Sequence, residues 1–325
     1  MVYLFAYLGQ GEKASAQFPQ VRNWFPFMKP KSKFLSLILL VFLTTSCSKS
    51  SSPPPASNDY TAFNNPQLVT INSYTSDAME PFISRDGQYL FFNSNTGGAT
   101  DKDIYYATRV DDTTFQNQGP ITAINSTAVD GTPTEDAAKN FYYVSLVSYN
   151  GTTNLNTLYS GTWNGSTVTG ITPLSSLTLS PPLLFFDIEV SPDGSTLYLS
   201  AGAFPGPSAA DIVIAVNSGG GFTLDSNSAS IMANVNTTDK LEYAPAISAN
   251  GLELFFTRFD PNTSQARIYR AVRSDTSSAF GIPQLVSAIT GFVEGPAFSP
   301  DEKSLYYHRL NTGTNKYEIY RVTRP

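Results

Sequence analysis

Cysteine and histidine are almost absent from this chain, and their scarcity limits the chemistry open to it. The 325 residues include one cysteine, Cys47, and one histidine, His308. A single cysteine excludes an internal disulfide, and a single histidine argues against a histidine-rich metal site. Any Ser-His-Asp triad would depend on His308 alone. We therefore expect no catalytic residue, no metal site and no cofactor.

Charge is scarce as well, and most of it has one sign. Asp, Glu, Lys and Arg together make up 14% of the residues, and the formal net charge is −6. Residues 1–46 hold five of the basic residues and one acid, so the remainder carries 15 basic and 25 acidic residues, a net charge of −10. An acidic domain repels phosphate backbones, so nucleic acid is not an expected partner.

Long helical periodicity is missing outside the N-terminal region, which predicts little helix. Aromatic residues are abundant, with 18 Tyr and 22 Phe, and so are the turn formers, with 22 Gly and 22 Pro. Aromatic and β-branched runs that are cut often by Gly, Pro, Asn and Asp are typical of many short strands. The composition therefore predicts an all-β protein.

The N-terminal region reads as an export signal. From Met28 the sequence is "MKPKSKFLSLILLVFLTTSCSKS", in which three lysines precede the apolar run 34–43, and the run ends shortly before Cys47. This segment resembles the signal peptide of bacterial lipoproteins, and the resemblance implies that Cys47 is lipidated as the first residue of the mature protein. The alternative is an ordinary cleaved signal, or a membrane anchor with an incidental cysteine.

These features divide the chain. We expect residues 1–27 to be an extension from an upstream mis-start, 28–46 the lipoprotein signal peptide, and 47–62 the lipidated cysteine with a Ser/Pro-rich tether. A lipid-anchored location in the bacterial cell envelope follows. Because Ser48 rather than Asp comes after the cysteine, the outer membrane is favoured, with the protein facing the periplasm or the cell surface.

Five segments of the remaining chain align with one another at a period of about 50 to 56 residues, which indicates a repeat architecture. They read "EPFISRDGQYLFF" from Glu80, "DGTPTEDAAKNFYY" from Asp130, "DIEVSPDGSTLYLS" from Asp187, "EYAPAISANGLELFF" from Glu242 and "EGPAFSPDEKSLYY" from Glu294. Each continues through a polar loop into a third strand-like run. The repeats therefore lie near 78–128, 129–184, 185–240, 241–291 and 292–325.

Turn residues separate the first two strands of the repeats. Asp86-Gly87, Asp193-Gly194 and Asn250-Gly251 are strong hairpin signals, because glycine accepts a positive φ and the polar side chain caps the turn. Two repeats have Ala138 and Glu302 where glycine is expected, so these two turns should differ in type. The second strands carry apolar residues on both faces, which suits sheets stacked face to face.

A fourth strand is expected in each repeat, at 120–125, at 170–175, within 222–236 and at 283–290. The fifth repeat ends without one, and "PQLV" at 283–286 recurs near the start of the domain at 66–69. Residues 66–73 should therefore complete the last repeat and close a ring. The predicted fold is a five-bladed β-propeller of four-stranded blades, formed by residues 63–325.

The repeats resemble the WD40-like PD40 repeat of TolB-type propellers, whose hallmark is Ser-Pro-Asp-Gly before an aliphatic-aromatic strand. Ser191-Pro192-Asp193-Gly194 matches it in full, and residues 299–301 and 84–87 match in part. The resemblance implies protein–protein contact in the periplasm. It is specific for the fold and poor in functional detail, because propellers serve many functions.

An acidic residue stands at the start of the first strand in every repeat, and such strands line the central channel of propellers. If the five converge, they form an anionic channel mouth that could bind a cation, a basic peptide or sugar hydroxyls; otherwise they are strand-end charges. The candidates are Glu80, Asp130, Asp187, Glu242 and Glu294.

The sequence favours a membrane-anchored, non-catalytic binding module that contacts an envelope protein. The first alternative is a lectin-like propeller that binds a cell-wall or surface glycan. The second is a glycoside hydrolase or other hydrolase, which needs two carboxylates about 5 to 10 Å apart. Acids that recur in every repeat suggest repeat structure rather than one specialised catalytic pair.

Overall fold

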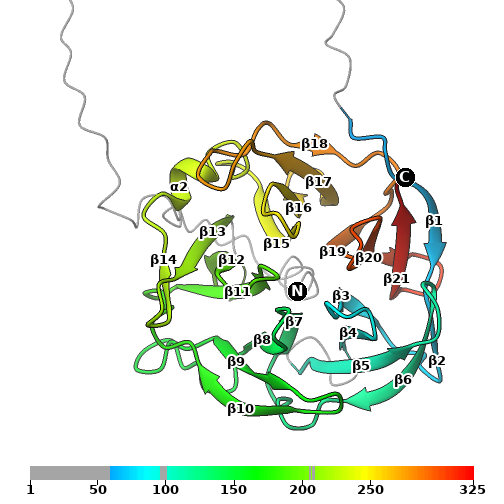
Figure 1. The fold of residues 1–325 in the computed structure, drawn as a ribbon, viewed down its shortest axis with the longest axis horizontal. Coiled ribbons are helices and arrows are strands. Elements are labelled where there is room, and N and C mark those ends of the chain that lie inside the picture. Colours follow the sequence, from blue (N-terminus) through cyan, green and yellow to red (C-terminus); the bar gives the residue numbers. More distant parts are fainter. Residues whose placement is uncertain (1–58, 96–100, 205, 207–208) are drawn as a thin grey trace, which may run out of the picture.

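The described residues of the computed structural model are 59–95, 101–204, 206 and 209–325, and they form a β-propeller (Figure 1). The expected lipidation site, signal peptide and most of the tether lie outside them. The one helix that the described residues contain, α2 (Ser228–Ile231), has four residues. Within the described chain, no helix has the length and apolarity needed to cross a membrane.

The strands form successive antiparallel blades around one axis, which confirms the predicted fold class. The first blade consists of β3 (Met79–Ile83), β4 (Tyr89–Ser94), β5 (Asp103–Arg109) and β6 (Thr114–Pro120). The second consists of β7 (Asp130–Glu135), β8 (Asn140–Ser145), β9 (Leu158–Trp163) and β10 (Val168–Pro173), and the third of β11 (Leu183–Val190), β12 (Thr196–Ala203), β13 (Ala210–Asn217) and β14 (Phe222–Leu224). The fourth consists of β15 (Leu241–Ile247), β16 (Glu253–Asp260), β17 (Gln265–Val272) and β18 (Gln284–Leu285), and the fifth of β19 (Val293–Phe298), β20 (Ser304–Asn311) and β21 (Lys316–Thr323).

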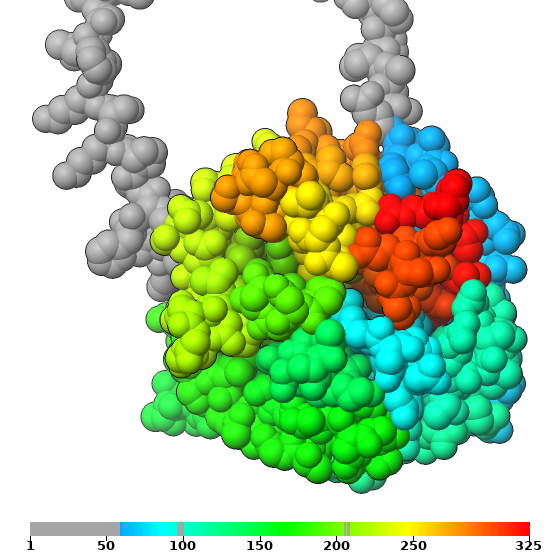
Figure 2. All heavy atoms as spheres, in the orientation of Figure 1, coloured from blue at the N-terminus to red at the C-terminus, as the bar shows by residue number. Residues whose placement is uncertain are grey.

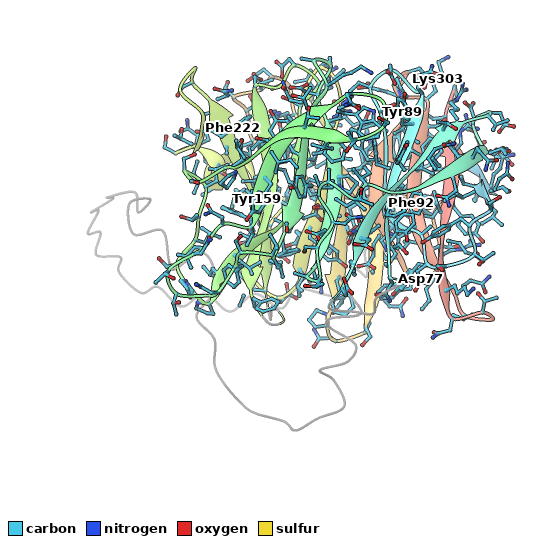
Figure 3. The ribbon with its side chains drawn as sticks, turned by 90° about the horizontal axis from the view of Figure 1, so that it is seen from below. Asp77, Tyr89, Phe92, Tyr159, Phe222 and Lys303 are labelled. Atoms are coloured by element: carbon cyan, nitrogen blue, oxygen red, sulfur yellow. The ribbon has the colours of Figure 1, made fainter. Side chains whose placement is uncertain are left out.

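The two ends of the axis differ. All inner strands begin at one end, here called the mouth face, and run to the hairpin turns at the other end, the turn face. Figure 3 shows Asp77 at the mouth face, with Tyr89 and Lys303 at the turn face. In the space-filling view of Figure 2 the blades meet around the centre as five colour sectors.

The core lies between neighbouring blades, as expected for strands with two apolar faces. Phe91 of β4 packs with Phe141 and Trp163 of the second blade, and the adjacent Phe92 lies in a cluster with Tyr306 of the fifth. Successive side chains of a strand point to opposite faces, so one aromatic pair can serve two interfaces.

The Asp-Gly turns form as predicted, with Gly87, Gly194 and Gly251 at φ of 73°, 71° and 72°. The expectation that the Glu302 turn differs in type is wrong. Glu302 adopts a φ of 57° in the same turn, and its N–H donates to the carbonyl of Ser299 at 2.9 Å. A non-glycine residue is tolerated there because the Glu302 carboxylate accepts the N–H of Ala249 from the fourth blade.

The turn of the second blade does differ, as expected. It is one residue shorter, since Asp136 N donates to the carbonyl of Asn140, four residues on, whereas Ser191 N donates to Thr196, five residues on. Lys139, rather than Ala138, takes the positive φ, 66°.

The fourth strand of the first blade is β6, residues 114–120, and not the expected 120–125. Only Phe115 of β6 is buried, so the strand lacks the apolar alternation that marks strands in a sequence. Residues beyond Pro120 turn toward the second blade. The Asn125 amide also bonds back to β5 of the first blade, at both the N–H and the carbonyl of Ile104, at 2.9 and 3.0 Å.

Residues 60–72, here called the N-terminal belt, close the ring across three blades. Tyr60 bridges to Val286 beside the fourth blade, and β1 (Asn64–Leu68) pairs antiparallel with β21 as the outer strand of the fifth. β2 (Thr70–Asn72) then pairs parallel with β6 of the first blade. The closure confirms the prediction, but the expected single strand 66–73 is divided at Val69, which is buried where the belt changes blades.

We expect Phe63→Ala to lower the free energy of unfolding of the full chain by about 3–5 kcal/mol. Phe63 is 2% exposed and meets the ring of Phe255 at 5.7 Å, so the change leaves a cavity beneath the belt. Chemical denaturation measures the loss, with Ile282→Ala, at a side chain that is 84% exposed, as the matched control. Equal stability of the two variants would show that the belt does not support the ring.

Candidate functional site

A bulge in each inner strand places one residue of each blade at the axis. The register of β3, β7, β11, β15 and β19 shifts against the following strand near the mouth face. The five residues at this level all line a narrow axial cavity: Glu80, Thr132, Asp187, Ala244 and Gly295. Four of them have a positive φ between 49° and 63°.

Proline follows the axial residue in four blades, at positions 81, 133, 245 and 296. Proline has no N–H, so it fits a bulge where a strand bond is lost. The third blade has Ile188 instead. Its register shifts at Phe186, one residue before the axial position, and the Asp187 carboxylate accepts the Ile188 N–H at 2.8 Å. Four blades thus place a proline after the axial residue, and the third instead has a carboxylate that binds the N–H.

The five predicted acids do not all reach the axis. Glu80 and Asp187 line the axial cavity, but Asp130 and Glu242 stand two residues before the axial position and Glu294 stands one before. Sequence reasoning aligned the repeats on their acids. That alignment missed Thr132, the third axial residue with a side-chain oxygen. An alignment of the repeats on their prolines would have identified it.

Asp130 and Glu242 hold the loops that enter their blades. Asp130 accepts the N–H of Ser126 at 2.6 Å, and burial raises its pKa. Glu242 accepts the N–H of Thr237 at 2.9 Å and pairs with the Arg258 Nε at 2.7 Å. Both carboxylates therefore have structural partners away from the axis.

Glu294 and the single histidine form a buried network beside the cavity. Glu294 accepts hydrogen bonds from the Tyr243 hydroxyl and, at 3.2 Å, from His308 Nε2. His308 Nδ1 accepts the backbone N–H of Glu80 at 2.9 Å, which assigns the proton to Nε2 and makes the ring neutral. Burial and the Glu294 charge raise the pKa of Tyr243 far above its ordinary value. The network fixes the backbone of an axial residue, so His308 is structural here.

Asn93 orients the Glu80 side chain from the second strand. Its Nδ2 donates to a Glu80 carboxylate oxygen, and its Oδ1 accepts the N–H of Thr132 at 3.1 Å. Gly131 makes this possible, because a Cβ at that position would lie 2.5 Å from Asn93 Nδ2. One amide thus couples two axial residues of neighbouring blades.

Arg85 ties three blades together toward the turn face. Its guanidinium donates to the carbonyls of Glu135 and Val190, at 2.8 and 2.7 Å, and pairs with Glu189 at 3.0 Å. Glu189 also accepts the Thr134 hydroxyl at 2.7 Å. This buried charge is therefore fully compensated, as a stable buried ion pair requires.

The axial cavity measures ≈ 30 Å³, and its lining includes Glu189 in addition to the axial residues. A second cavity of ≈ 190 Å³ lies between the first and fifth blades at the turn face. Arg109 and Arg321 both pair with Asp112 there, at 2.5 and 2.7 Å, so its lining charges largely satisfy one another.

Half-buried apolar side chains lie at the mouth ends of the second to fifth blades. Tyr149 and Phe204 meet edge to face at 6.2 Å, and Phe259 and Phe292 do so at 6.4 Å. With Leu146 they pack on one buried cluster beneath the third and fourth blades. These five residues are called the mouth-face aromatic patch below.

The fold and the axial ring place this chain in the β-propeller class. No family model matches the chain, and no curated protein matches its sequence.

Solved structures share the fold. A thermostable family-43 glycoside hydrolase superimposes with a TM-score of 0.52 at 11% identity, over 79% of this chain and 92% of that chain. The catalytic domain of the GH62 α-L-arabinofuranosidase of Coprinopsis cinerea gives 0.49 at 11% identity, over 83% and 98%. TolB from Acinetobacter baumannii gives 0.44 at 12% identity over 76% of this chain, which spans 55% of the TolB chain. Identities this low establish fold and not activity.

Gly295→Ala should destabilise the protein by roughly 2 kcal/mol or more. Gly295 has a φ of 63°, and a Cβ there would lie 3.1 Å from both Glu80 Cα and His308 Nδ1. Thermal and urea unfolding measure the effect. Gly220→Ala is the control, because a Cβ at Gly220 meets no atom within 4 Å. A Gly295 variant as stable as the control would show that the close approach is dispensable.

Glu135→Gln should make the protein more stable at pH 8, with a much smaller gain at pH 5. Burial raises the pKa of Glu135 to about 7, against the opposing charge of Lys139. The folded state therefore favours the protonated acid, and this contribution is lost as the pH rises from the unfolded pKa, near 4.3, through about 7.

The expected gain at pH 8 is on the order of 2 kcal/mol. Denaturation curves at both pH values measure it, with the exposed Asp239→Asn as control. A gain of the same size at pH 5 would show that the effect does not arise from ionisation of Glu135.

Proposed function

We propose that this protein is a lipid-anchored, non-catalytic propeller of the bacterial cell envelope that binds another envelope protein through its mouth face. The observation that carries the proposal is the mouth-face aromatic patch. Half-buried aromatic side chains on otherwise polar loops are the residues that contribute most to protein–protein binding energy.

The arrangement of the patch is that of a binding surface rather than of core side chains that are partly exposed by chance. Three of its four aromatic residues come from loops, and Phe259 lies at the end of β16. Val147, in the Tyr149 loop, is 55% exposed. The pairs are held edge to face on a rigid buried cluster. Rigid aromatic anchors lose little side-chain entropy on binding, so they favour association.

The two cavities described above offer little room for an enclosed ligand, which favours recognition on the surface in this part of the chain. Sites that enclose small molecules usually measure about 300–1,000 Å³. The axial cavity of ≈ 30 Å³ and the turn-face cavity of ≈ 190 Å³ are both smaller. A sugar or another organic substrate would find little enclosure in either.

The disposition of the acids weighs against a hydrolase. Asp130, Glu242 and Glu294 hold loops, an arginine and a histidine through hydrogen bonds. Of the five predicted acids, Glu80 and Asp187 share the narrow axial cavity, which leaves little room for a sugar between them and a second carboxylate.

The proposed anchor suits this orientation. A lipid on Cys47 would reach the folded region through Asp59 and Tyr60, and Tyr60 docks on the outer side of the fourth blade by donating its N–H to the Leu285 carbonyl at 2.8 Å. Attachment at the outer rim leaves the centre of the mouth face accessible to a partner.

The proposal predicts that a photo-cross-linking residue at Val147 of the full lipoprotein captures one dominant protein in the native host. The same probe at Ile282, which lies on the turn-face rim next to Val272, serves as control and should not capture that protein. Tyr149→Ala with Phe204→Ala should abolish the Val147 product while leaving the fold intact. The captured protein, once purified, should bind the full lipoprotein and not the double variant.

Capture at both positions alike, or capture that survives the double variant, would contradict the proposed surface. Saturable binding of a purified envelope glycan without turnover would favour the lectin-like alternative. Glycan cleavage lost in both Glu80→Gln and Asp187→Asn would establish a hydrolase.

A further inference from the structure

The turn-face cavity of ≈ 190 Å³ holds charges of both signs that do not pair with one another. Asp86 and Asp301 line it from the hairpin turns of the first and fifth blades, and Arg109 and Arg321 line it from the third strands, β5 and β21. In the described chain, Asp86 pairs with Lys139, and Asp301 forms no ion pair. Neither arginine therefore reaches either of these two carboxylates.

A third carboxylate positions the basic end of the cavity. Arg109 and Arg321 both pair with Asp112, at 2.5 and 2.7 Å, and Arg321 Nε donates to the Ser304 hydroxyl at 3.0 Å. A guanidinium has five N–H donors. These bonds use one N–H of Arg109 and two of Arg321, and neither side chain makes another hydrogen bond with a described residue. Asp112 therefore compensates charge and leaves N–H donors for a ligand.

Two serines separate the acidic end from the basic end along the fifth blade. Asp301 Oδ1 accepts the Ser299 hydroxyl at 2.6 Å, and Ser299 Oγ accepts the N–H of Ser304 at 2.9 Å. Ser304 Oγ in turn accepts Arg321 Nε. All four residues line the cavity, so one wall carries a carboxylate and a guanidinium with two serines between them. Asp301 Oδ2 makes no hydrogen bond with a described residue and is left for a ligand.

The remaining wall of the cavity is apolar and well packed. Ile83, Phe115 and Tyr306 line it and are 3%, 0% and 2% exposed. The turns of the two blades approach closely, since a Cβ at Gly87 would lie 3.5 Å from Pro300 Cγ. A ligand held between the charged ends would therefore lie against buried carbon.

The size and the charges of the cavity select the kind of ligand. Its volume is below the range of about 300–1,000 Å³ that is usual for drug-sized ligands. An engineered cavity of about 150 Å³ binds benzene, so roughly six to ten non-hydrogen atoms fit here, fewer than in a hexose. A simple anion would meet Asp112 and Asp301, and a simple cation would meet two arginines. A molecule with one anionic and one cationic group suits both ends.

We propose that the turn-face cavity binds a small zwitterionic α-amino acid with an apolar side chain. Arg109 and Arg321 donate to its carboxylate, which guanidinium groups match in geometry. Its ammonium donates to Asp301, and its side chain packs against Ile83 and Phe115. The site lies at the end of the axis opposite to the mouth-face aromatic patch. It goes beyond the proposed function and does not depend on the proposed partner.

Calorimetric titration of the full lipoprotein in detergent with L-leucine, up to about 10 mM, tests the proposal. Leucine should bind at one site per chain, and Asp301→Asn and Arg109→Gln should each raise the Kd about tenfold or more. Asp193→Asn is the matched control. Asp193 accepts the Ser191 hydroxyl at 2.6 Å in the corresponding turn of the third blade but does not line the cavity, so this variant should bind as the unmodified protein does.

Both test substitutions should preserve the fold. In the turn of the fourth blade, Asn250 already accepts the Ser248 hydroxyl at 2.8 Å and the Leu252 N–H at 2.9 Å, so an asparagine can replace Asp301. The Arg109 side chain is 41% exposed, and an exposed ion pair contributes little stability. The melting temperatures without leucine should therefore match that of the unmodified protein.

Ligand analogues test the two charged ends without a substitution in the protein. L-Leucine methyl ester lacks the carboxylate and N-acetyl-L-leucine lacks the ammonium, so each should bind at least about tenfold more weakly than leucine. No saturable binding of leucine up to the highest concentration would overturn the proposal. A Kd that neither substitution changes, or an analogue that binds as well as leucine, would overturn it too.

Discussion

Five inner strands have to run side by side down one narrow axis, and the rest of the molecule depends on how each of them bends to do so. The bulge in each strand leaves a backbone position without a ladder partner. Proline follows the axial residue in four blades, and in the third, whose register shifts at Phe186, the Asp187 carboxylate accepts the N–H of Ile188. Gly295 and Gly131 then leave the space in which His308 and Asn93 reach the neighbouring axial residues.

Local chemistry made much of the fold predictable from the sequence. The Asp-Gly turns, the aromatic second strands and the repeated "PQLV" are each determined by a few neighbouring residues. Together they predicted the propeller and its closure. The failures are of another kind. Glu302 keeps the common turn because Ala249 of another blade donates to it, and β6 forms with one buried residue, Phe115, because its neighbours supply the ladder. The first is a contact between blades, and the second is pairing of β6 with β5 of its own blade and with β2 of the belt; neither appears in the local sequence pattern.

The candidate site was only partly predictable for a related reason. A shift of one residue moves a side chain to the other face of a strand, so an acid near the start of a strand can point to the axis or into a loop. Sequence reasoning found Glu80 and Asp187 but grouped them with Glu294, which bonds His308 instead. Thr132 is uncharged, so a search for acidic residues did not identify it. Its signal was its place before Pro133, and that signal becomes visible only when the prolines are aligned.

The two faces of the molecule have different physical characters. Toward the turn face, guanidinium groups and carboxylates bond across blades, as Arg85 does with Glu189 and Arg324 does with Glu253. At the mouth face, ion pairs such as Arg258 with Glu242 stay within one blade, and the contacts across blades include aromatic rings. Charged ties fix the relative position of blades, whereas partly exposed rings leave apolar area that another surface can cover. The fold thus separates the region that holds the ring together from the region suited to contact.

The belt also sets how the ring would respond to mechanical load. Tension from the N-terminal side would arrive first at Tyr60, whose ring lies under the Arg270 guanidinium at 4.2 Å and whose hydroxyl bonds Arg324 at 3.0 Å. Beyond it, β1 runs along β21 and β2 along β6, so the pull would shear strand pairs lengthwise rather than unzip them one bond at a time. Strands loaded in this way share the force among several hydrogen bonds at once. A chain held by that end would keep its closure under tension that a simple terminal hairpin would not withstand.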